Sequence, residues 1–254
     1  MLAVSCSPER RAIEITFELE FNGQPISCAN QVRGVRLTDF RFYVHELRLL
    51  GSEGQEFPVQ LTPDGIWQND QVALIDLETG QGACVNGSAE TNRVVSGSYV
   101  GGDGEGIAFA VGVPQELNHA DPMQVGAPLN YTEMHWHWAS GYKFLRAGVE
   151  SDADGFFLHL GSSRCEGTIG AIKGCKSANR PVVRLPEFRA GTHSVVIDLG
   201  ELFAGVEWQD EERSDCQSGP TDKECRDPFA RLGIDFESGE STGKATVFKT
   251  GPLE

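Results

Sequence analysis

The sequence predicts an all-β protein, an antiparallel β-sandwich or barrel with long loops and one or two short helices, held together by disulfides. Short runs rich in β-branched and aromatic residues recur between Gly, Pro, Asn and Asp, whereas helical periodicity is scarce. With 254 residues, 30 Gly and 12 Pro, the chain can bury a core and still be rich in loops. We find neither a repeat nor a linker, so we expect one domain over 1–254, with 1–5 and 251–254 as cloning additions or mobile ends.

The first two strands carry the clearest patterns. From Arg11 to Phe21 apolar residues alternate with polar ones, which is typical of a strand with one buried face. Asn22-Gly23 then predicts a turn. From Val35 to Leu50 the apolar phase changes near His45-Glu46, which predicts either two strands or one long strand with a bulge.

Shorter elements follow along the rest of the chain. The further predicted strands are Val72–Leu77, Val94–Val100, Ile107–Val113, Phe156–Leu160, Val182–Leu185, His193–Leu199 and Ala245–Phe248. Short helices are predicted at Leu202–Val206 and Asp227–Gly233. The glycine-rich stretch 100–106 is expected to be a hairpin loop and not a phosphate cradle, because no Lys-Ser/Thr pair or helix start follows it.

Charge and hydropathy exclude two classes of partner. The formal net charge is −16, which argues against nucleic acid, because binding to phosphates draws on Lys and Arg. An acidic surface favours a basic protein partner or multivalent cations. No window approaches the roughly 18 consecutive apolar residues of a membrane helix, so we expect a soluble chain.

Seven cysteines point to an oxidising compartment if they pair. Cys165 with Cys175 and Cys216 with Cys225 would each close a short loop, and Cys28 with Cys84 would close a longer one. Cys6 is then left over, although spacing alone does not decide the connectivity. Zinc is the rival interpretation, and the absence of a CxxC knuckle argues against it.

The segment Met134-His135-Trp136-His137-Trp138 is the most informative part of the chain for function. Histidine is the commonest transition-metal ligand and tryptophan is readily oxidised, so the segment indicates metal or redox chemistry. The alternative is structural, because aromatic and polar residues also alternate in a half-buried strand.

Three further histidines could supply ligands from elsewhere in the chain. His45, His119 and His159 stand in separate predicted strands or loops, and each could equally be a packed core residue. If they converge, imidazoles suit copper or zinc. The chain has no GxSxG, HExxH or P-loop motif, so we expect no enzymatic activity.

Several motifs in order resemble one known family. They are Asp39-Phe40-Arg41-Phe42-Tyr43-Val44-His45, Leu117-Asn118-His119-Ala120-Asp121-Pro122, Ala127-Pro128-Leu129-Asn130, Met134-x-Trp136-x-Trp138-x-x-Gly141-Tyr142-Lys143-Phe144, His159-Leu160-Gly161-Ser162-x-x-Cys165 and the Cys216 to Cys225 pair. Together they span nearly the whole chain. They resemble the metallo-mystery pair four-Cys-motif family, the MbnP-like periplasmic proteins.

The resemblance implies a periplasmic or secreted β-rich copper-binding protein in copper acquisition or homeostasis. It further implies a partner, a MauG-like di-haem enzyme of the cytochrome c peroxidase type that oxidises one tryptophan to kynurenine. Trp136 and Trp138 are then the candidates for oxidation, and His45, His119 and His159 the candidate copper ligands. The precursor would carry a leader and could carry a lipid anchor.

His135 and His137 occupy variable positions of the family's tryptophan motif, so the resemblance gives them no role. In an extended segment they face away from both tryptophans. One further alternative stays open, a secreted recognition or adhesion β-sandwich without metal, in which the tryptophans form a ligand platform and the histidines only pack.

Overall fold

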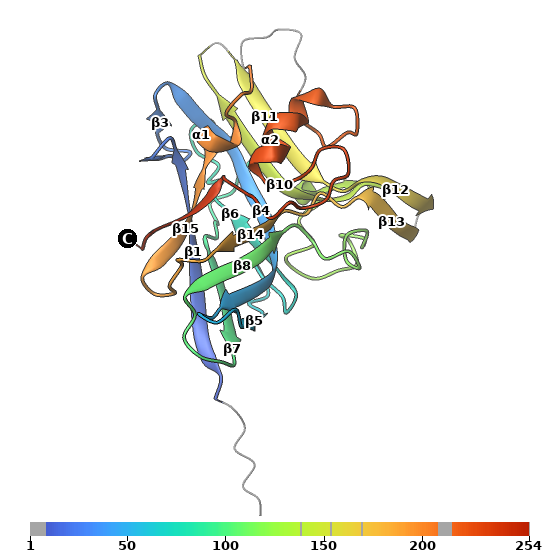
Figure 1. Cartoon of the computed structure of the whole chain (residues 1–254). Coiled ribbons are helices and arrows are strands. Elements are labelled where there is room, and N and C mark those ends of the chain that lie inside the picture. The colour runs from blue at the N-terminus through green and yellow to red at the C-terminus, as the bar shows by residue number, and fades with distance from the viewer. Residues whose placement is uncertain (1–8, 138, 153, 169, 208–214, 254) are drawn as a thin grey trace, which may run out of the picture.

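A computed structural model describes residues 9–137, 139–152, 154–168, 170–207 and 215–253 (Figure 1). The strands are β1 (Arg11–Phe21), β2 (Gln24–Pro25), β3 (Gln31–Val32), β4 (Val35–Leu50), β5 (Glu56–Leu61), β6 (Val72–Asp76), β7 (Val94–Tyr99), β8 (Gly106–Val111), β9 (His135–His137), β10 (Gly141–Glu150), β11 (Gly155–Gly161), β12 (Ser163–Thr168), β13 (Ala171–Ser177), β14 (Val182–Leu185), β15 (His193–Asp198) and β16 (Phe248–Pro252). The helices are α1 (Leu199–Leu202) and α2 (Arg226–Arg231), with 3-10 turns η1 (Thr132–Met134) and η2 (Lys223–Cys225). The predicted all-β class with two short helices is confirmed.

The long strand β4 is the centre of the fold. It pairs with β10 along its first half and with β6, β8 and β5 further on. The predicted bulge is confirmed: β4 is one strand of 16 residues whose register with β8 shifts between His45 and Arg48. Glu46 has a φ of 51°, a left-handed conformation that lets the strand bend without ending.

The bounds predicted for β1 are confirmed, and its apolar face enters the core. The ring of Phe17 is fully buried and meets Phe42 and Phe109 edge to face, with centroids 5.4 and 5.7 Å apart. Such contacts add to the burial of apolar area, the main favourable term in folding. One pairing departs from the expected antiparallel pattern, because β1 runs parallel to β15 from Phe17 opposite Val195 onward.

Two other expectations about the C-terminal part are corrected. The strand predicted at Ala245–Phe248 lies instead at β16 (Phe248–Pro252), where Gly251 pairs with Ser194. The backbone N–H of Leu253 donates to Thr192. Residues 251–253 are thus part of the fold and not a mobile end, while 1–5 and 254 lie outside the described residues.

Helix positions also differ by a few residues from those predicted. The first begins at Leu199 instead of Leu202, because the Asp198 carboxylate accepts hydrogen bonds from the Gly200 and Glu201 N–H groups. An N-cap of this kind starts a helix one residue after itself. The second, α2, covers Arg226–Arg231 and so overlaps the predicted Asp227–Gly233, but it begins one residue earlier and ends two residues earlier.

All three predicted disulfides are present, Cys28–Cys84, Cys165–Cys175 and Cys216–Cys225. The first and third are buried in the core. The second joins β12 to β13, which form a separate two-stranded sheet that projects from the molecule (Figure 1).

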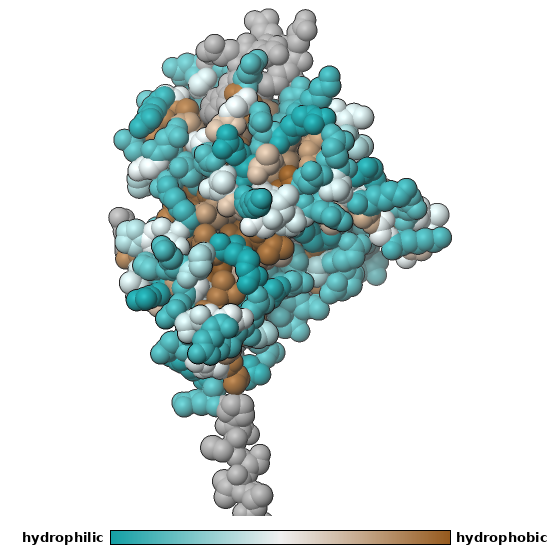
Figure 2. Space-filling model, viewed as in Figure 1, coloured by the Kyte–Doolittle hydropathy of each residue, from teal (hydrophilic) through white to brown (hydrophobic). Residues whose placement is uncertain are grey.

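Polar residues cover most of the face in Figure 2, as the acidic composition leads one to expect. Within the described residues, no helix has the length and hydropathy needed to cross a membrane.

Candidate functional site

Trp136 lies in β9, a short strand that pairs with the start of β10. Its side chain is half-buried. The turn after it is held by His137, whose Nδ1 accepts from the Ala139 N–H at 3.2 Å and whose carbonyl accepts from the Ser140 N–H at 3.0 Å. The other candidate for oxidation, Trp138, lies outside the described residues.

Gly161 at the end of β11 makes room for the indole of Trp136. A Cβ at this glycine would lie 2.6 Å from Cζ3 of Trp136 and 2.9 Å from the carbonyl oxygen of Tyr142. Both distances are too short for any side chain. The absence of a Cβ at position 161 therefore lets the tryptophan ring rest against β11.

His159, two residues earlier in β11, is the histidine beside Trp136. The two rings meet edge to face with centroids 6.2 Å apart. Burial lowers the pKa of His159 to about 4, and the positive charges of Arg146 and Lys143 act in the same direction. Its Nε2 is buried and has no hydrogen-bond partner among the described residues. A neutral imidazole with a free nitrogen is the form that binds metal ions.

The segment beginning at Cys216 runs beside β11 and holds His159 in place. The backbone N–H of His159 donates to the Cys216 carbonyl at 2.8 Å, and the Cys216 N–H donates to Phe157 at 3.0 Å. Ser218 Oγ donates to the His159 carbonyl at 2.9 Å and accepts from the Gly161 N–H at 3.0 Å. We call residues 215–218 the edge strap. The Cys216–Cys225 disulfide ties this strap to the turn before α2.

A surface pocket of about 550 Å³ opens over Trp136, and we call it the Trp136 pocket. The turn after β9, the start of β12 and the end of the edge strap form its walls. Trp136, Cys165 and Ser218 are among its lining residues. The indole is therefore reachable from solvent while its inner edge contacts His159 and Gly161.

His45 lies elsewhere, at the bulge of β4. It is only 4% exposed and its Nδ1 has no partner among the described residues. Burial lowers its pKa to about 4, with Arg180 adding to the effect. It pairs with Val72 of β6 and Ala110 of β8, so its neighbours differ from those of Trp136.

His119 lies in a third place, in the loop before η1. Its Nε2 is 3.4 Å from Sγ of Cys175 and 3.2 Å from Nδ2 of Asn118. Asn118 also accepts from the backbone N–H of Tyr142 through its side-chain oxygen. These contacts position the imidazole against the Cys165–Cys175 disulfide.

The structure does not bring the three predicted copper ligands together as one cluster. In the described part of the chain, two groups of three His, Cys, Asp or Glu residues have ligand atoms within 4.8 Å of one another. These are His119, Cys165 and Cys175, and Cys216, Asp222 and Cys225. Of the predicted ligands, only His159 adjoins a described candidate tryptophan, and the three-histidine set stays a prediction.

A buried network of charges lies behind His159, and the sequence analysis did not identify it. Arg146, opposite His159 on β10, forms an ion pair with Asp39, and Arg41 contacts Asp39 at 3.3 Å and Glu78 at 2.8 Å. Burial raises the pKa of Glu78 to about 8, with the Asp39 charge adding to the effect. The signal was present in the charged residues of an otherwise apolar Asp39-Phe40-Arg41-Phe42 strand.

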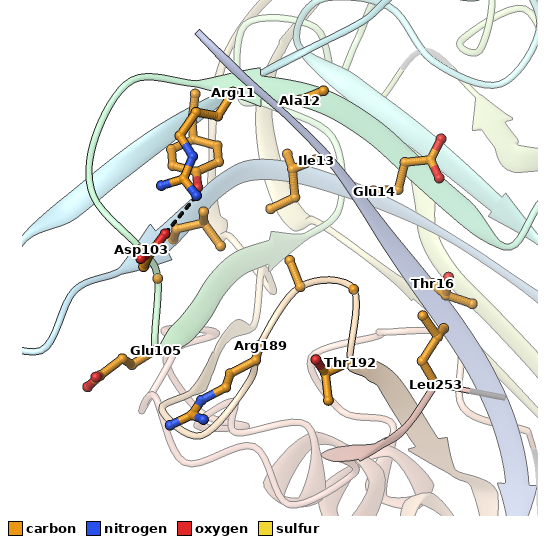
Figure 3. A pocket seen from close by; sticks show the side chains of 15 residues that line it. Arg11, Ala12, Ile13, Glu14, Thr16, Asp103, Glu105, Arg189, Thr192 and Leu253 are labelled. Carbon is orange, nitrogen blue, oxygen red and sulfur yellow. Dashed lines mark ion pairs between the residues drawn. The ribbon is translucent and has the colours of Figure 1, made fainter. Parts of the chain in front are cut away.

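Another hollow on the described surface has a different character (Figure 3). It measures about 930 Å³ and lies between β1, the loop 103–105 and the loop 189–192. Arg11 and Asp103 form an ion pair of 2.6 Å across its rim. Its lining contains neither histidine nor cysteine nor tryptophan, so it lacks the imidazole, thiol and indole groups of the predicted copper and oxidation site.

Fold and site together define a disulfide-stapled all-β protein with a half-buried tryptophan and a half-buried neutral histidine at one sheet edge. The chain belongs to the MbnP family, whose model matches residues 10–218. Among solved structures it is similar to MbnP from Methylosinus trichosporium, with 24% identity and a TM-score of 0.85 over 97% of this chain and 100% of that one. No curated protein matches the chain. The family resemblance predicted from the motifs is confirmed.

Proposed function

We propose that this MbnP-family chain is a periplasmic copper-binding protein, not an enzyme, that serves in copper acquisition or homeostasis. Trp136 is the residue that a di-haem partner of the MauG type oxidises to kynurenine. The observation that carries this proposal is the position of Trp136, with one edge open to the Trp136 pocket and the other against His159. The indole can thus be oxidised from outside, and its product lies beside a metal-binding nitrogen.

The oxidation balances with peroxide as co-oxidant. Two equivalents of peroxide place two oxygen atoms across the C2–C3 bond of the indole, which breaks, and two waters leave. Hydrolysis by one further water releases formate and leaves kynurenine, a net gain of one oxygen and loss of one carbon. The indole N–H, which only donates, becomes an aniline nitrogen beside a ketone.

The residues present fit copper. His159 is neutral at neutral pH, and its buried Nε2 has no partner among the described residues. An unpartnered buried nitrogen costs stability, and a metal ligand role explains why such a nitrogen is kept. Imidazole together with an aniline nitrogen suits copper better than the hard cations, because both donors are nitrogens. His159 and the modified Trp136 are the first ligands, and His45 and His119 remain candidates for completing the set.

The partner must withdraw electrons from Trp136, and the Trp136 pocket supplies the surface for its approach. Long-range attraction to a basic docking face on the partner follows from the net charge of −16. Three disulfides suit an oxidising compartment, which supports the periplasmic or secreted location.

Co-expression with a di-haem partner, followed by intact mass and peptide mapping, tests the modification. We expect the change of one oxygen gained and one carbon lost to appear on Trp136 and to vanish in Trp136→Phe. A change confined to Trp138 would contradict the assignment of Trp136.

Copper titration of the modified protein tests the metal site. His159→Ala should weaken binding at least about tenfold, the size typical of losing a ligand or its support. His193→Ala is the matched control, because His193 caps a turn by accepting from the Arg189 N–H at 3.0 Å, away from Trp136. If neither copper binding nor a mass change is seen, the result would favour the alternative of a secreted recognition or adhesion β-sandwich without metal.

A further inference from the structure

We infer that reduction of the Cys165–Cys175 disulfide creates a second metal site, in which both cysteine thiolates and His119 bind Cu(I). This site adjoins the Trp136 pocket through Cys165 but uses none of the atoms of Trp136 or His159. It does not depend on the proposed function, because it forms in protein with an unmodified tryptophan.

The three donor atoms already lie together. Nε2 of His119 and the two Sγ atoms are within 4.8 Å of one another, and Nε2 is 3.4 Å from Sγ of Cys175. Nε2 also lies 3.2 Å from the amide nitrogen of Asn118. Because an amide nitrogen only donates, Nε2 accepts this hydrogen bond in the tautomer that leaves its lone pair free of hydrogen. A bound metal would replace that hydrogen bond.

The chemistry of the donors selects a soft monovalent ion. Two thiolates and one imidazole are the soft donor set that Cu(I) prefers. Zinc in structural sites takes four protein ligands. Within the described residues the group contains no fourth His, Cys, Asp or Glu.

Position distinguishes this disulfide from the other two. Cys165 and Cys175 are both half-buried, whereas Cys28 is 4% exposed and Cys84, Cys216 and Cys225 are fully buried. A thiol–disulfide exchange reagent needs access to sulfur, so Cys165–Cys175 is the bond it reaches first. The other three-ligand group, Cys216, Asp222 and Cys225, has equally close donors, but both of its cysteines are buried in the core.

The fold can keep the two sulfurs close after the bond is opened. β12 and β13 form their own two-stranded sheet, in which Cys165 is the direct cross-strand partner of Cys175. Arg164 links the strands by donating from Nε to Ser177 Oγ at 2.8 Å, and it ties β12 to the C-terminal part of the chain by donating from Nη2 to the Glu237 carbonyl at 2.8 Å. Lys176 and Glu166 add an ion pair of 2.6 Å. These hydrogen bonds and this ion pair do not involve the strands of the 14-stranded main sheet.

The steps balance with a dithiol reductant of the thioredoxin type. The dithiol transfers two electrons and two protons to the S–S bond, which breaks to give two thiols, and the reductant becomes a disulfide. Cu(I) then binds the two sulfurs and Nε2 of His119, and two protons leave to solvent.

The test compares oxidised and reduced protein carrying unmodified tryptophan. A dithiol is added under native conditions, thiols are labelled and mapped by mass, and Cu(I) is titrated against a chromophoric chelator. Apart from any label on Cys6, which would be shared by oxidised and reduced protein, we expect new labels on Cys165 and Cys175 only, and one Cu(I) per chain beyond the oxidised protein. His119→Ala, which leaves the disulfide intact, should weaken this extra binding at least tenfold, and His193→Ala should not.

Three results would overturn the inference. They are reduced protein that binds no extra Cu(I), equal extra binding by His119→Ala, or labels that appear on all six disulfide cysteines at once. Circular dichroism of each reduced variant separates loss of binding from loss of fold. A Cys165→Ser/Cys175→Ser variant should resemble the oxidised protein in Cu(I) stoichiometry with or without the dithiol. Failure of this site would leave the Trp136 modification untouched, since that is read by mass on a different residue.

Discussion

Replacing Gly161 with alanine tests whether the close approach of Trp136 to β11 is needed. The new Cβ would lie 2.6 Å from Cζ3 of Trp136 and 2.9 Å from the backbone carbonyl of Tyr142. The carbonyl belongs to β10, which pairs with both β4 and β11 and cannot move freely. The indole must therefore shift toward the Trp136 pocket.

Overpacking by one methyl group costs about 1–3 kcal/mol. For a chain of this size each kcal/mol lowers the melting temperature by about 2–4 °C, so we expect a drop of several degrees. Thermal unfolding by circular dichroism measures it. The displaced indole should also show red-shifted fluorescence and a changed extent of partner-dependent oxidation.

Gly126→Ala is the matched control, because a Cβ at Gly126 meets no atom within 4 Å. It should leave both the melting temperature and the fluorescence close to those of the wild type. The reasoning is refuted if Gly161→Ala behaves like Gly126→Ala in both measurements, since the indole would then not depend on the missing Cβ.

Three further predictions concern the surroundings of the site. The pKa of His159 is about 4 in the folded protein and about 6.5 in the unfolded chain, so the unfolded state binds more protons between these values. The contribution of neutral His159 to stability is complete above pH 6.5 and is lost as the pH falls toward 4, with a loss of about 2 kcal/mol at pH 5. His159→Asn should therefore flatten this part of the curve of unfolding free energy against pH, measured by denaturant unfolding. Glu78 has its pKa raised to about 8 and is mostly protonated at pH 7, so Glu78→Gln should lower the free energy of unfolding little at that pH. Asp39→Asn should lower it by about 3–5 kcal/mol in urea unfolding, because this change leaves buried arginine charge uncompensated. Similar losses of stability from both variants would contradict this assignment. Cys216→Ser/Cys225→Ser should destabilise the protein by about 2–4 kcal/mol. It should also speed hydrogen exchange at the His159 amide, which donates to the Cys216 carbonyl. Unchanged exchange at this amide would show that the edge strap keeps its place without the disulfide.

Local patterns predicted the elements that depend on local physics. The alternation over Arg11–Phe21 predicted β1 to the residue, because a sheet with one buried face selects apolar side chains at every second position. The phase change at His45-Glu46 predicted, for the same reason, an irregularity there, either two strands or one bulged strand, and the structure has the bulged strand. β10 was missed, because burial on both faces removes the alternation and its Lys143 and Arg146 resemble surface residues.

The arrangement of the site was less accessible to sequence. The histidines at 45, 119 and 159 look equivalent in the sequence, yet one lies at a bulge, one against a disulfide and one beside Trp136. Which side chains meet depends on strand pairing between residues far apart in the chain, and no local pattern encodes that pairing. The edge strap is an example, since Cys216 accepts a hydrogen bond from His159, which lies 57 positions earlier in the chain.

The sequence by itself determined the all-β class, the first strand and the family, because periodicity and ordered motifs are properties of the chain alone. It also indicated the three cysteine pairs and the irregularity near His45-Glu46, but it did not decide the connectivity or choose between a bulge and two strands. Only the tertiary structure decided that β1 and β15 run parallel and that β16, with residues 251 and 252, pairs with β15. It also decided that Trp136 rests on Gly161 beside His159. These features arise from long-range pairing and packing, where one missing Cβ or one crossover between distant strands sets which residues touch.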